Sequence, residues 1–431
     1  MKRIALIAAA CAALPAAAAA QVAVRGEMVY TMAGAPIRDG VVLVGRDGKI
    51  ERVGPAAEVP VPAGYRTLTA RVVTPGLVDA HSVVGLAGAL GQPHDQDQLD
   101  RSSDAIQPEL RAIDAYNARE DLVAWLRGFG VTTVHTGHGP GALISGQTMI
   151  VKTRGDDVGD ALVDTTTMLA FTLGPSVAPN FRNAGTRARG VALLRAELLK
   201  AQEYARKARA GEEQPRDLGM EVLGRLLAGE VTALVTAHRV SEILAALRLA
   251  QEFGFRMVLD GAAESHMVID EIRRAGVAVI IHPTMARPFD ELESASVETA
   301  KRLRDAGITV ALQSGYEGYV PKTRVVLFEA AIAAANGLGM EDALRTITID
   351  AAKVIGLEKR VGSLEAGKDG DVVLFDGDPF EYTTHVCAVL IEGQGGERDL
   401  PLNYRSHAET QRTQRKGERV LLFLCVLCVS A

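Results

Sequence analysis

Residues 74–83 read Thr74-Pro75-Gly76-Leu77-Val78-Asp79-Ala80-His81-Ser82-Val83. Neighbouring side chains of a β-strand point to opposite faces, so residues two apart share a face. Two histidines with that spacing after a buried apolar run would direct both imidazoles to one metal ion. This chain has His81 at the first position and Val83 at the second. The stretch therefore predicts a strand of a metal-site fold that has lost one ligand.

Strand-like and helix-like segments alternate after this stretch. The predicted strands cover residues 231–236, 256–259, 277–281 and 308–312, and the helices that follow them cover 241–253, 264–275, 297–306 and 323–336. Repeated βα units imply a parallel sheet, and a span of about 280 residues is a usual size for a (β/α)8 barrel. We therefore predict an α/β fold, a (β/α)8 TIM barrel, over residues 76–356. Residues 187–210 are amphipathic and predict an outer helix.

The chain on either side of this barrel has β patterning. Asp47-Gly48 stands between two apolar runs and predicts a hairpin turn. We expect residues 21–75 and 357–394 to pair into one small β-sandwich. Residues 395–431 are polar and Arg-rich and then apolar, and we expect them to form a disordered tail.

The N-terminus has the pattern of a secretory signal peptide. Lys2 and Arg3 precede an apolar run over 4–14, and small residues lead to a cleavage position near Ala20. The run is too short to span a bilayer. We expect residues 1–20 to be removed and the mature protein to be periplasmic or secreted.

The composition narrows the class of partner. Hydrophobic residues make up 48% of the chain and charged residues 23%, which is ordinary for a globular protein. A formal net charge of −6 shows no basic excess, which argues against binding to nucleic acid or an anionic membrane. We expect a small-molecule substrate and no membrane span. The sequence leaves the oligomeric state open.

Three signatures occur in order along the chain. The first is Pro75–His81, the second is Gly130–Val134, and the third is Gly362–Leu374 followed by Asp376–Pro379. Together they resemble the amidohydrolase superfamily, in its imidazolonepropionase-like and prolidase-like branch. The resemblance implies a barrel that holds one or two divalent ions, often zinc. Such an ion lowers the pKa of its bound water to about 7, so that hydroxide attacks a polarised carbonyl.

The resemblance assigns metal ligands to individual residues. His81 matches the first ligand of strand one, and His238 matches the strand-five histidine. Lys152 lies near the place where related proteins carry a metal-bridging lysine. These three residues are the predicted metal ligands.

The chain departs from the family pattern at three ligand positions. Val83, Gly261 and Gly315 stand where ligands are expected on strands one, six and eight. A binuclear site is therefore not expected. The prediction is a reduced site for one divalent ion, zinc first, or no metal at all.

Other polar residues follow predicted strands, at the catalytic end of a barrel. His135 and His138 follow the second strand and His282 ends another, and these three are the predicted substrate-binding residues. A buried, hydrogen-bonded role is the alternative for each. Asp260 and Glu264 are acid–base candidates for a metal-free reaction.

The sequence thus predicts an exported hydrolase that acts on a C–N bond through a reduced metal site. The bond would belong to a non-peptide amide, a cyclic amide or a dipeptide-like molecule. The alternative is a catalytically inactive relative that binds a small molecule or partner without metal.

Overall fold

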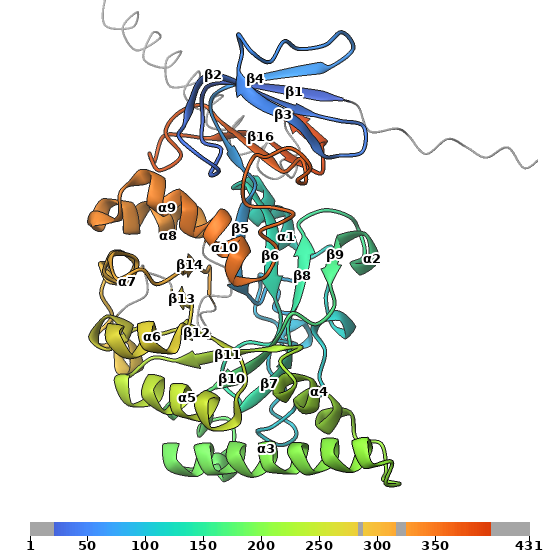
Figure 1. Cartoon of the computed structure of the whole chain (residues 1–431), viewed down its shortest axis with the longest axis vertical. Helices are drawn as coiled ribbons and strands as arrows, with labels where there is room; N and C mark the ends of the chain where they lie inside the picture. Colours follow the sequence, from blue (N-terminus) through green and yellow to red (C-terminus); the bar gives the residue numbers. More distant parts are fainter. Residues whose placement is uncertain (1–20, 283–287, 316–324, 398–431) are drawn as a thin grey trace, which may run out of the picture.

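The computed structural model describes residues 21–282, 288–315 and 325–397. The predicted signal peptide and residues 398–431 of the predicted tail lie outside them. A sheet from both chain ends lies at one end of the molecule, and the long helix α3 lies at the other (Figure 1).

The sheet at the chain ends has seven strands in the order β17-β16-β15-β4-β1-β2-β3. Its strands are β1 (Val22–Val29), β2 (Ile37–Val44), β3 (Ile50–Pro55), β4 (Arg66–Pro75), β15 (Val372–Phe375), β16 (Val386–Ile391) and β17 (Gln394–Glu397). The predicted hairpin at Asp47-Gly48 joins β2 to β3. The hydrogen bonds make one continuous sheet where a sandwich was predicted, and β17 extends three residues into the predicted tail.

Strand β4 runs directly into β5 (Leu77–Ser82), which begins the second part of the fold. That part contains a sheet of four strands, β5-β6-β8-β9, with β6 (Val131–Thr136), β8 (Met149–Lys152) and β9 (Leu162–Asp164). It also contains a sheet of six strands, β14-β13-β12-β11-β10-β7. These are β7 (Ile144–Gln147), β10 (Met168–Thr172), β11 (Thr232–Ala237), β12 (Met257–Gly261), β13 (Val279–Ile281) and β14 (Val310–Leu312).

The four predicted βα units are present, and β10 to β14 are parallel as predicted. Strand β8 instead pairs antiparallel with β6, and β7 pairs antiparallel with β10. Only Thr148 separates β7 from β8, so the chain passes directly from the six-stranded sheet into the four-stranded sheet at this point. The two sheets approach again at a single bridge between Ser82 and Gly315. The fold is TIM-barrel-like, but the described strands do not form one ring of eight parallel strands.

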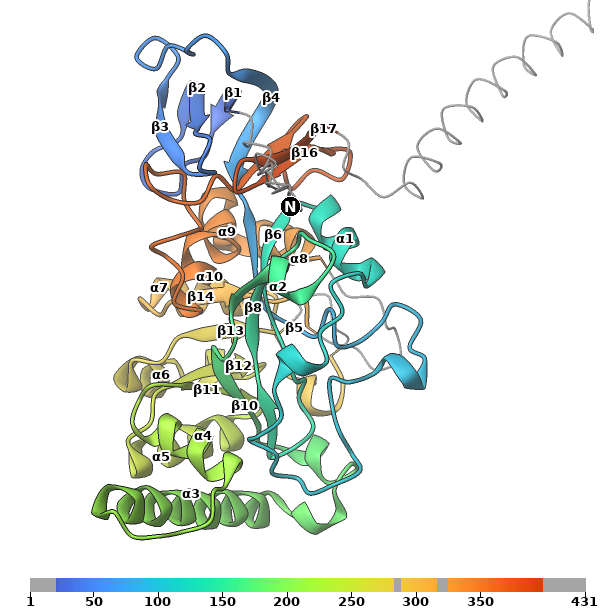
Figure 2. The ribbon, with the colours of Figure 1, turned by 90° about the vertical axis from the view of Figure 1, so that its right-hand side faces the viewer.

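Helices cover the strands on the outside (Figure 2). They are α1 (Asp121–Gly128), α2 (Val158–Ala161), α3 (Arg187–Ala210), α4 (Leu218–Leu227), α5 (Val240–Phe253), α6 (Ile269–Ala275), α7 (Thr299–Asp305), α8 (Val326–Ala333), α9 (Met340–Thr346) and α10 (Ile349–Val354). Helix α3 has the predicted bounds, because Thr186 caps its first turn and Gly211 ends it in a left-handed conformation. Among the described residues, no helix has the length and apolarity needed to cross a membrane.

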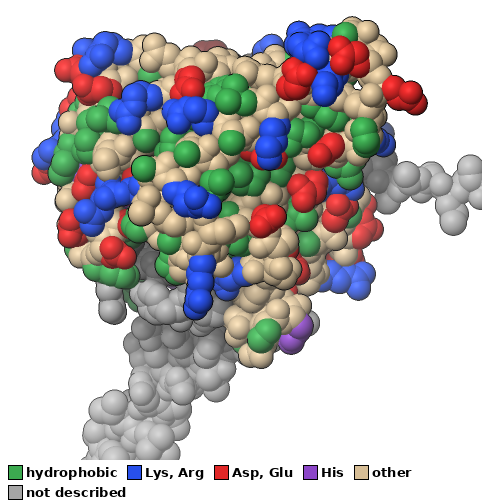
Figure 3. Space-filling view, turned by 90° about the horizontal axis from the view of Figure 1, so that it is seen from below, with side chains coloured by type: hydrophobic (Ala, Val, Ile, Leu, Met, Phe, Trp, Pro, Cys, Tyr) green, Lys and Arg blue, Asp and Glu red, His purple; other side chains and the backbone are tan. Residues whose placement is uncertain are grey.

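The face seen in Figure 3 carries basic and acidic side chains side by side. This mixing agrees with the modest net charge of the sequence. It is not the basic stripe that binds a nucleic-acid backbone.

Candidate active site

The site is built around a contact between His81 and Asp260. His81 lies near the end of β5, and Asp260 lies near the end of β12. The His81 Nδ1 atom donates to Asp260 Oδ1 over 3.0 Å, and both residues are buried. Two strands far apart in the sequence therefore bring an imidazole and a carboxylate together at the same end of the fold.

Two further residues hold the Asp260 carboxylate in place. The Gln313 Nε2 atom, just after β14, donates to Oδ1 over 3.0 Å. The Thr236 hydroxyl of β11 donates to Oδ2 over 2.6 Å. Side chains from the ends of three other strands thus meet on the Asp260 carboxylate, which fixes its orientation.

His81 and Asp260 shift each other's pKa. Burial alone would raise the pKa of Asp260, but His81 and the Thr236 hydroxyl lower it below its usual range. Burial alone would lower the pKa of His81, but Asp260 and Asp79 raise it. Burial also raises the pKa of Asp79 to about 7, although the backbone N–H groups of Ser314 and His81 donate to it. The contact therefore favours a basic imidazole beside an ionised carboxylate.

His238 and His282 form a second histidine pair at this end of the strands. Their ring centroids are 6.5 Å apart and the rings are nearly perpendicular. Burial lowers the pKa of His238, and burial together with His238 lowers that of His282 to about 4. Both imidazoles are therefore neutral at neutral pH, with a nitrogen lone pair available.

Gly261 explains why the strand-six ligand is missing. A Cβ atom built on Gly261 would lie 2.4 Å from Cε1 of His238. Gly261 also has a φ of +72°, a conformation that side chains disfavour. The ring of His238 has taken the space in which a side chain at this position would begin.

His135 does not have the predicted substrate-binding role. Its Nδ1 atom donates to the carbonyl of Ala80 over 2.7 Å, and its Nε2 atom accepts from the Thr148 hydroxyl over 2.6 Å. Burial lowers its pKa to about 3. His135 is a neutral core residue whose two nitrogens are already used, so that prediction is wrong.

His138 is also buried, and its ring packs where a side chain on Gly146 would lie. Burial lowers its pKa to about 4. Its contact with substrate stays a prediction, as does that of His282.

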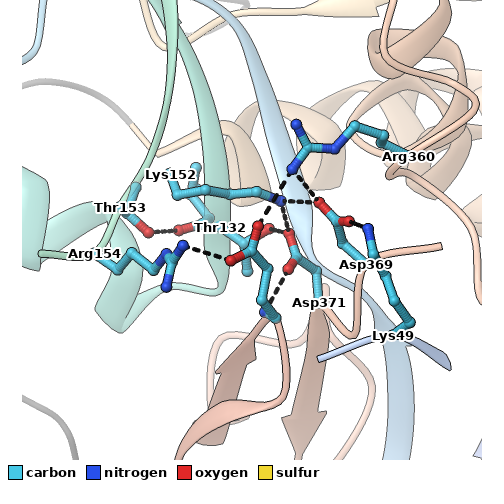
Figure 4. Close-up of polar contacts among 10 residues, drawn as sticks. Lys49, Thr132, Lys152, Thr153, Arg154, Arg360, Asp369 and Asp371 are labelled. Atoms are coloured by element: carbon cyan, nitrogen blue, oxygen red, sulfur yellow. Dashed lines mark hydrogen bonds and ion pairs between the residues drawn. The ribbon is translucent and has the colours of Figure 1, made fainter. Parts of the chain in front are cut away.

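Figure 4 shows Lys152 pointing between Asp369 and Asp371. Its Nζ atom is 2.5 Å from Asp371 Oδ2 and 3.2 Å from Asp369 Oδ2. On β8 it stands opposite Thr133, near the start of β6, whereas His81 is near the end of β5. The amine is occupied by two carboxylates at the other end of the strands, which contradicts the predicted role of Lys152 as a metal ligand. It joins the barrel-like part to the seven-stranded sheet.

The remaining histidines have donor atoms that suit a metal ion. His81 Nε2, His238 Nδ1 and His282 Nδ1 are buried and have no hydrogen-bond partner among the described residues. A metal-bound histidine usually donates its other ring N–H to a carboxylate, as His81 does to Asp260. Over the described part of the chain, however, no three His, Cys, Asp or Glu residues converge on one point. The unpartnered imidazole nitrogens are donor atoms of the kind that a divalent ion uses, and the reduced metal site stays a prediction.

A cavity of about 140 Å³ opens beside these residues. It is lined by Gln98, Leu99, Arg101, Pro140, Gly141, Ser176, Asn180, Thr236, His238 and Glu291. Its lining includes one cation, Arg101, and one carboxyl group, Glu291. The volume of the cavity is large enough for a molecule, or part of one, about the size of benzene.

Comparisons with known proteins agree with this geometry. Residues 257–417 match the Amidohydrolase family. Amidohydrolase tasK of Hapsidospora irregularis is 26% identical over 408 residues, which are 86% of this chain but 41% of that protein. The imidazolonepropionase of Rhizorhabdus wittichii is 25% identical over 381 residues, which are 82% of this chain and 92% of that protein. The crystal structure of an amidohydrolase from Thermotoga maritima superposes with a TM-score of 0.81 and 28% identity, covering 87% of this chain and 99% of that chain.

A barrel-like α/β fold with histidine and carboxylate side chains at its strand ends is the arrangement of a barrel enzyme. Together with these likenesses, it places the chain in one family. The protein belongs to the amidohydrolase superfamily, and it is a hydrolase of the class that acts on carbon–nitrogen bonds.

The sequence did not reveal how Asp260 is used. It was an acid–base candidate, and the structure makes it the centre of the site. Gln313 and Thr236 were missed altogether. All three lie at or just after the carboxyl ends of parallel strands, where barrel enzymes place their functional residues, and that position was the available signal.

Proposed function

We propose that the protein is an exported hydrolase of a C–N bond in a small non-peptide amide, cyclic amide or dipeptide-like molecule, and that it works with a reduced metal site. One observation carries the proposal. Asp260 holds His81 by Nδ1, and His81 Nε2 is left buried and without a partner. This is the arrangement of a metal-ligating histidine with its orienting carboxylate.

His81 and His238 are the residues that would hold a single divalent ion. When bound, such an ion activates a water molecule and polarises the carbonyl of the amide. Asp260 keeps the proton of His81 on Nδ1 and raises the basicity of the ring, which strengthens Nε2 as a donor. Thr236 and Gln313 prevent Asp260 from turning away.

The cavity beside His238 supports a small substrate. Its volume of about 140 Å³ suits one small ring or one amino-acid residue. The lining of amide, hydroxyl and charged side chains suits a polar molecule. A ring amide, as in the substrate that names the imidazolonepropionase relatives, is of this size.

Export is proposed from the charged, apolar and small-residue pattern of residues 1–20. Fusing these residues to a reporter that is active only outside the cytoplasm tests it. Removal of Lys2 and Arg3 should abolish the reporter signal, because the charged region is needed for targeting.

The test of the hydrolase is metal content and turnover measured together. The mature protein is purified without chelator and assayed against cyclic amides, simple amides and dipeptides. We expect about one equivalent of a divalent ion, lost together with activity in His81→Ala and His238→Ala. His385→Ala, which removes an exposed histidine of the other sheet, should change neither.

A small-molecule binding protein without turnover is the second candidate. The observation that favours it is Gln313, whose amide lies on Asp260 near the tip of strand eight and cannot carry a proton. Protein without bound metal that hydrolyses none of the panel would replace the hydrolase by this candidate.

A further inference from the structure

Glu291 enters the cavity from a different part of the chain than the histidines. It belongs to the short 3-10 turn Asp290–Leu292, beyond β13, and lines the same cavity as Thr236 and His238. The backbone N–H of Ser176 donates to Glu291 Oε1 over 3.0 Å. The carboxyl group is therefore fixed by a hydrogen bond and is not a loose surface group.

The space for this carboxyl group depends on Gly174. A Cβ atom on Gly174 would lie 2.8 Å from Glu291 Oε1 and 3.3 Å from an oxygen of Glu242. Gly174 also has a φ of +148°, which glycine adopts readily. Two carboxyl groups from separate elements are thus packed against one glycine.

The charges around Glu291 favour its protonated form. Burial raises its pKa to about 7, and the nearby carboxylates of Glu242 on α5 and Asp290 on its own turn act in the same direction. The N–H of Ser176 and the guanidinium of Arg239 lower the pKa of Glu291 and so act in the opposite direction, although burial outweighs them. Arg239 is also shared with Glu293 at 3.2 Å and with the carbonyl of Asp290 at 2.8 Å.

Arg101 is the other charged group in the cavity lining. Because the N–H of Ser176 donates to Glu291 Oε1, Oε2 is the oxygen that would carry the proton in the protonated form.

Hydrolysis of an amide creates a need for such a group. The leaving nitrogen must receive a proton, because an amide anion is a very poor leaving group, and a placed acid supplies it. Gln313 cannot do so, because its side chain is a carboxamide. Among the residues that line this cavity, Glu291 has the one carboxyl group.

We propose, resting on the proposed hydrolase function, that Glu291 is the catalytic acid that protonates the leaving nitrogen of the substrate. The oxygen of water forms a bond to the carbonyl carbon while the carbon–nitrogen bond breaks. The proton on Glu291 Oε2 passes to the nitrogen, which leaves as a neutral amine. The resulting carboxylate recovers a proton that the attacking water releases, so the net reaction adds one water molecule.

The test compares two amides with the same acyl group. One has an alkylamine leaving group, which must be protonated, and the other has p-nitroaniline, which leaves with little help. Glu291→Gln should reduce kcat on the alkylamide by about 10²- to 10⁴-fold and on the anilide by less than about tenfold. The high-pH arm of the alkylamide profile should also disappear.

Glu381→Gln is the control, since it removes an exposed carboxylate between β15 and β16 that does not line the cavity. It should leave both rates unchanged. An equal loss on the two amides in Glu291→Gln would overturn the proposal, because a structural role affects both substrates alike.

Failure of the hydrolase proposal gives a different result, namely wild-type protein that hydrolyses neither amide. Infrared difference spectra then decide the state of Glu291 without turnover. We expect a protonated carboxyl band at pH 6 that fades by pH 8 and is absent in Glu291→Gln. A Glu291 that is already ionised at pH 6 cannot be the acid and overturns the assignment.

Discussion

The ring of His238 occupies the place where a side chain on Gly261 would start, with Cε1 2.4 Å from the position of its Cβ. A side chain at the strand-six position would therefore require the ring of His238 to move. It would also have to accept the left-handed backbone of Gly261, which has a φ of +72°.

Gly261→Ala should destabilise the protein, because the added methyl group collides with His238 and the backbone is left-handed. Gly276→Ala is a matched control, since Gly276 has a φ of +66° but nothing within 4 Å of the added atom. We expect Gly261→Ala to lose about 1–3 kcal/mol more than the control in urea unfolding. Equal losses would show that the collision with His238 is not real.

Asp260→Asn should weaken the site in two measurable ways. Removing one member of a buried ion pair leaves the other uncompensated, which costs about 3–5 kcal/mol. The pKa of His81 should fall, because Asp260 is the partner that raises it against burial. Chemical unfolding gives the first value, and NMR titration of the His81 ring gives the second.

The control for Asp260→Asn is Asp376→Asn. Asp376 contacts His385 at 3.2 Å, but that pair is exposed, and exposed pairs contribute about 0–1 kcal/mol. If the two variants lost the same stability, the buried pair would not have the role given to it here.

His135 makes stability depend on pH in a predictable direction. Its pKa is lowered to about 3 in the folded protein, so below pH 6.5 the unfolded chain binds a proton that the folded chain does not. Its contribution is complete above pH 6.5 and is lost as the pH falls towards 3. Between pH 7 and pH 5 the loss should be about 2 kcal/mol.

Urea unfolding at these two pH values, in wild type and in His135→Asn, isolates this contribution. The variant should lose about 2 kcal/mol less than wild type on acidification. The exposed His385→Asn should follow wild type. An unchanged pH dependence in His135→Asn would mean that His135 is not held neutral.

Particular elements show how much of the fold and of the site could be predicted from the sequence. Helix α3 was predicted with its bounds from its amphipathic pattern, and in the structure Thr186 caps its first turn and Gly211 ends it. The antiparallel strand β7 was not predicted, because Ile144-Ser145-Gly146-Gln147 has only one apolar residue and its sequence does not indicate the direction of its partner strand. His81 and His238 were found from local motifs. Lys152 was misplaced because strand register decides which end of the barrel a side chain faces, and Asp260 needed three partners that are 24 to 179 residues away.

Lys152 should be essential for stability and irrelevant to metal binding. Its amine is buried between Asp371 and Asp369, so Lys152→Met leaves two buried carboxylates without this partner and should cost about 3–5 kcal/mol. Replacing Asp371 by Leu in the same chain should recover part of that loss, because the unpaired charge is removed. Unfolding curves measure the loss of stability in Lys152→Met and its recovery in the double variant. Elemental mass spectrometry of the folded Lys152→Met variant should find the same metal content as in wild type. If Lys152→Met lost metal without losing stability, Lys152 would be a metal ligand and this prediction would be wrong.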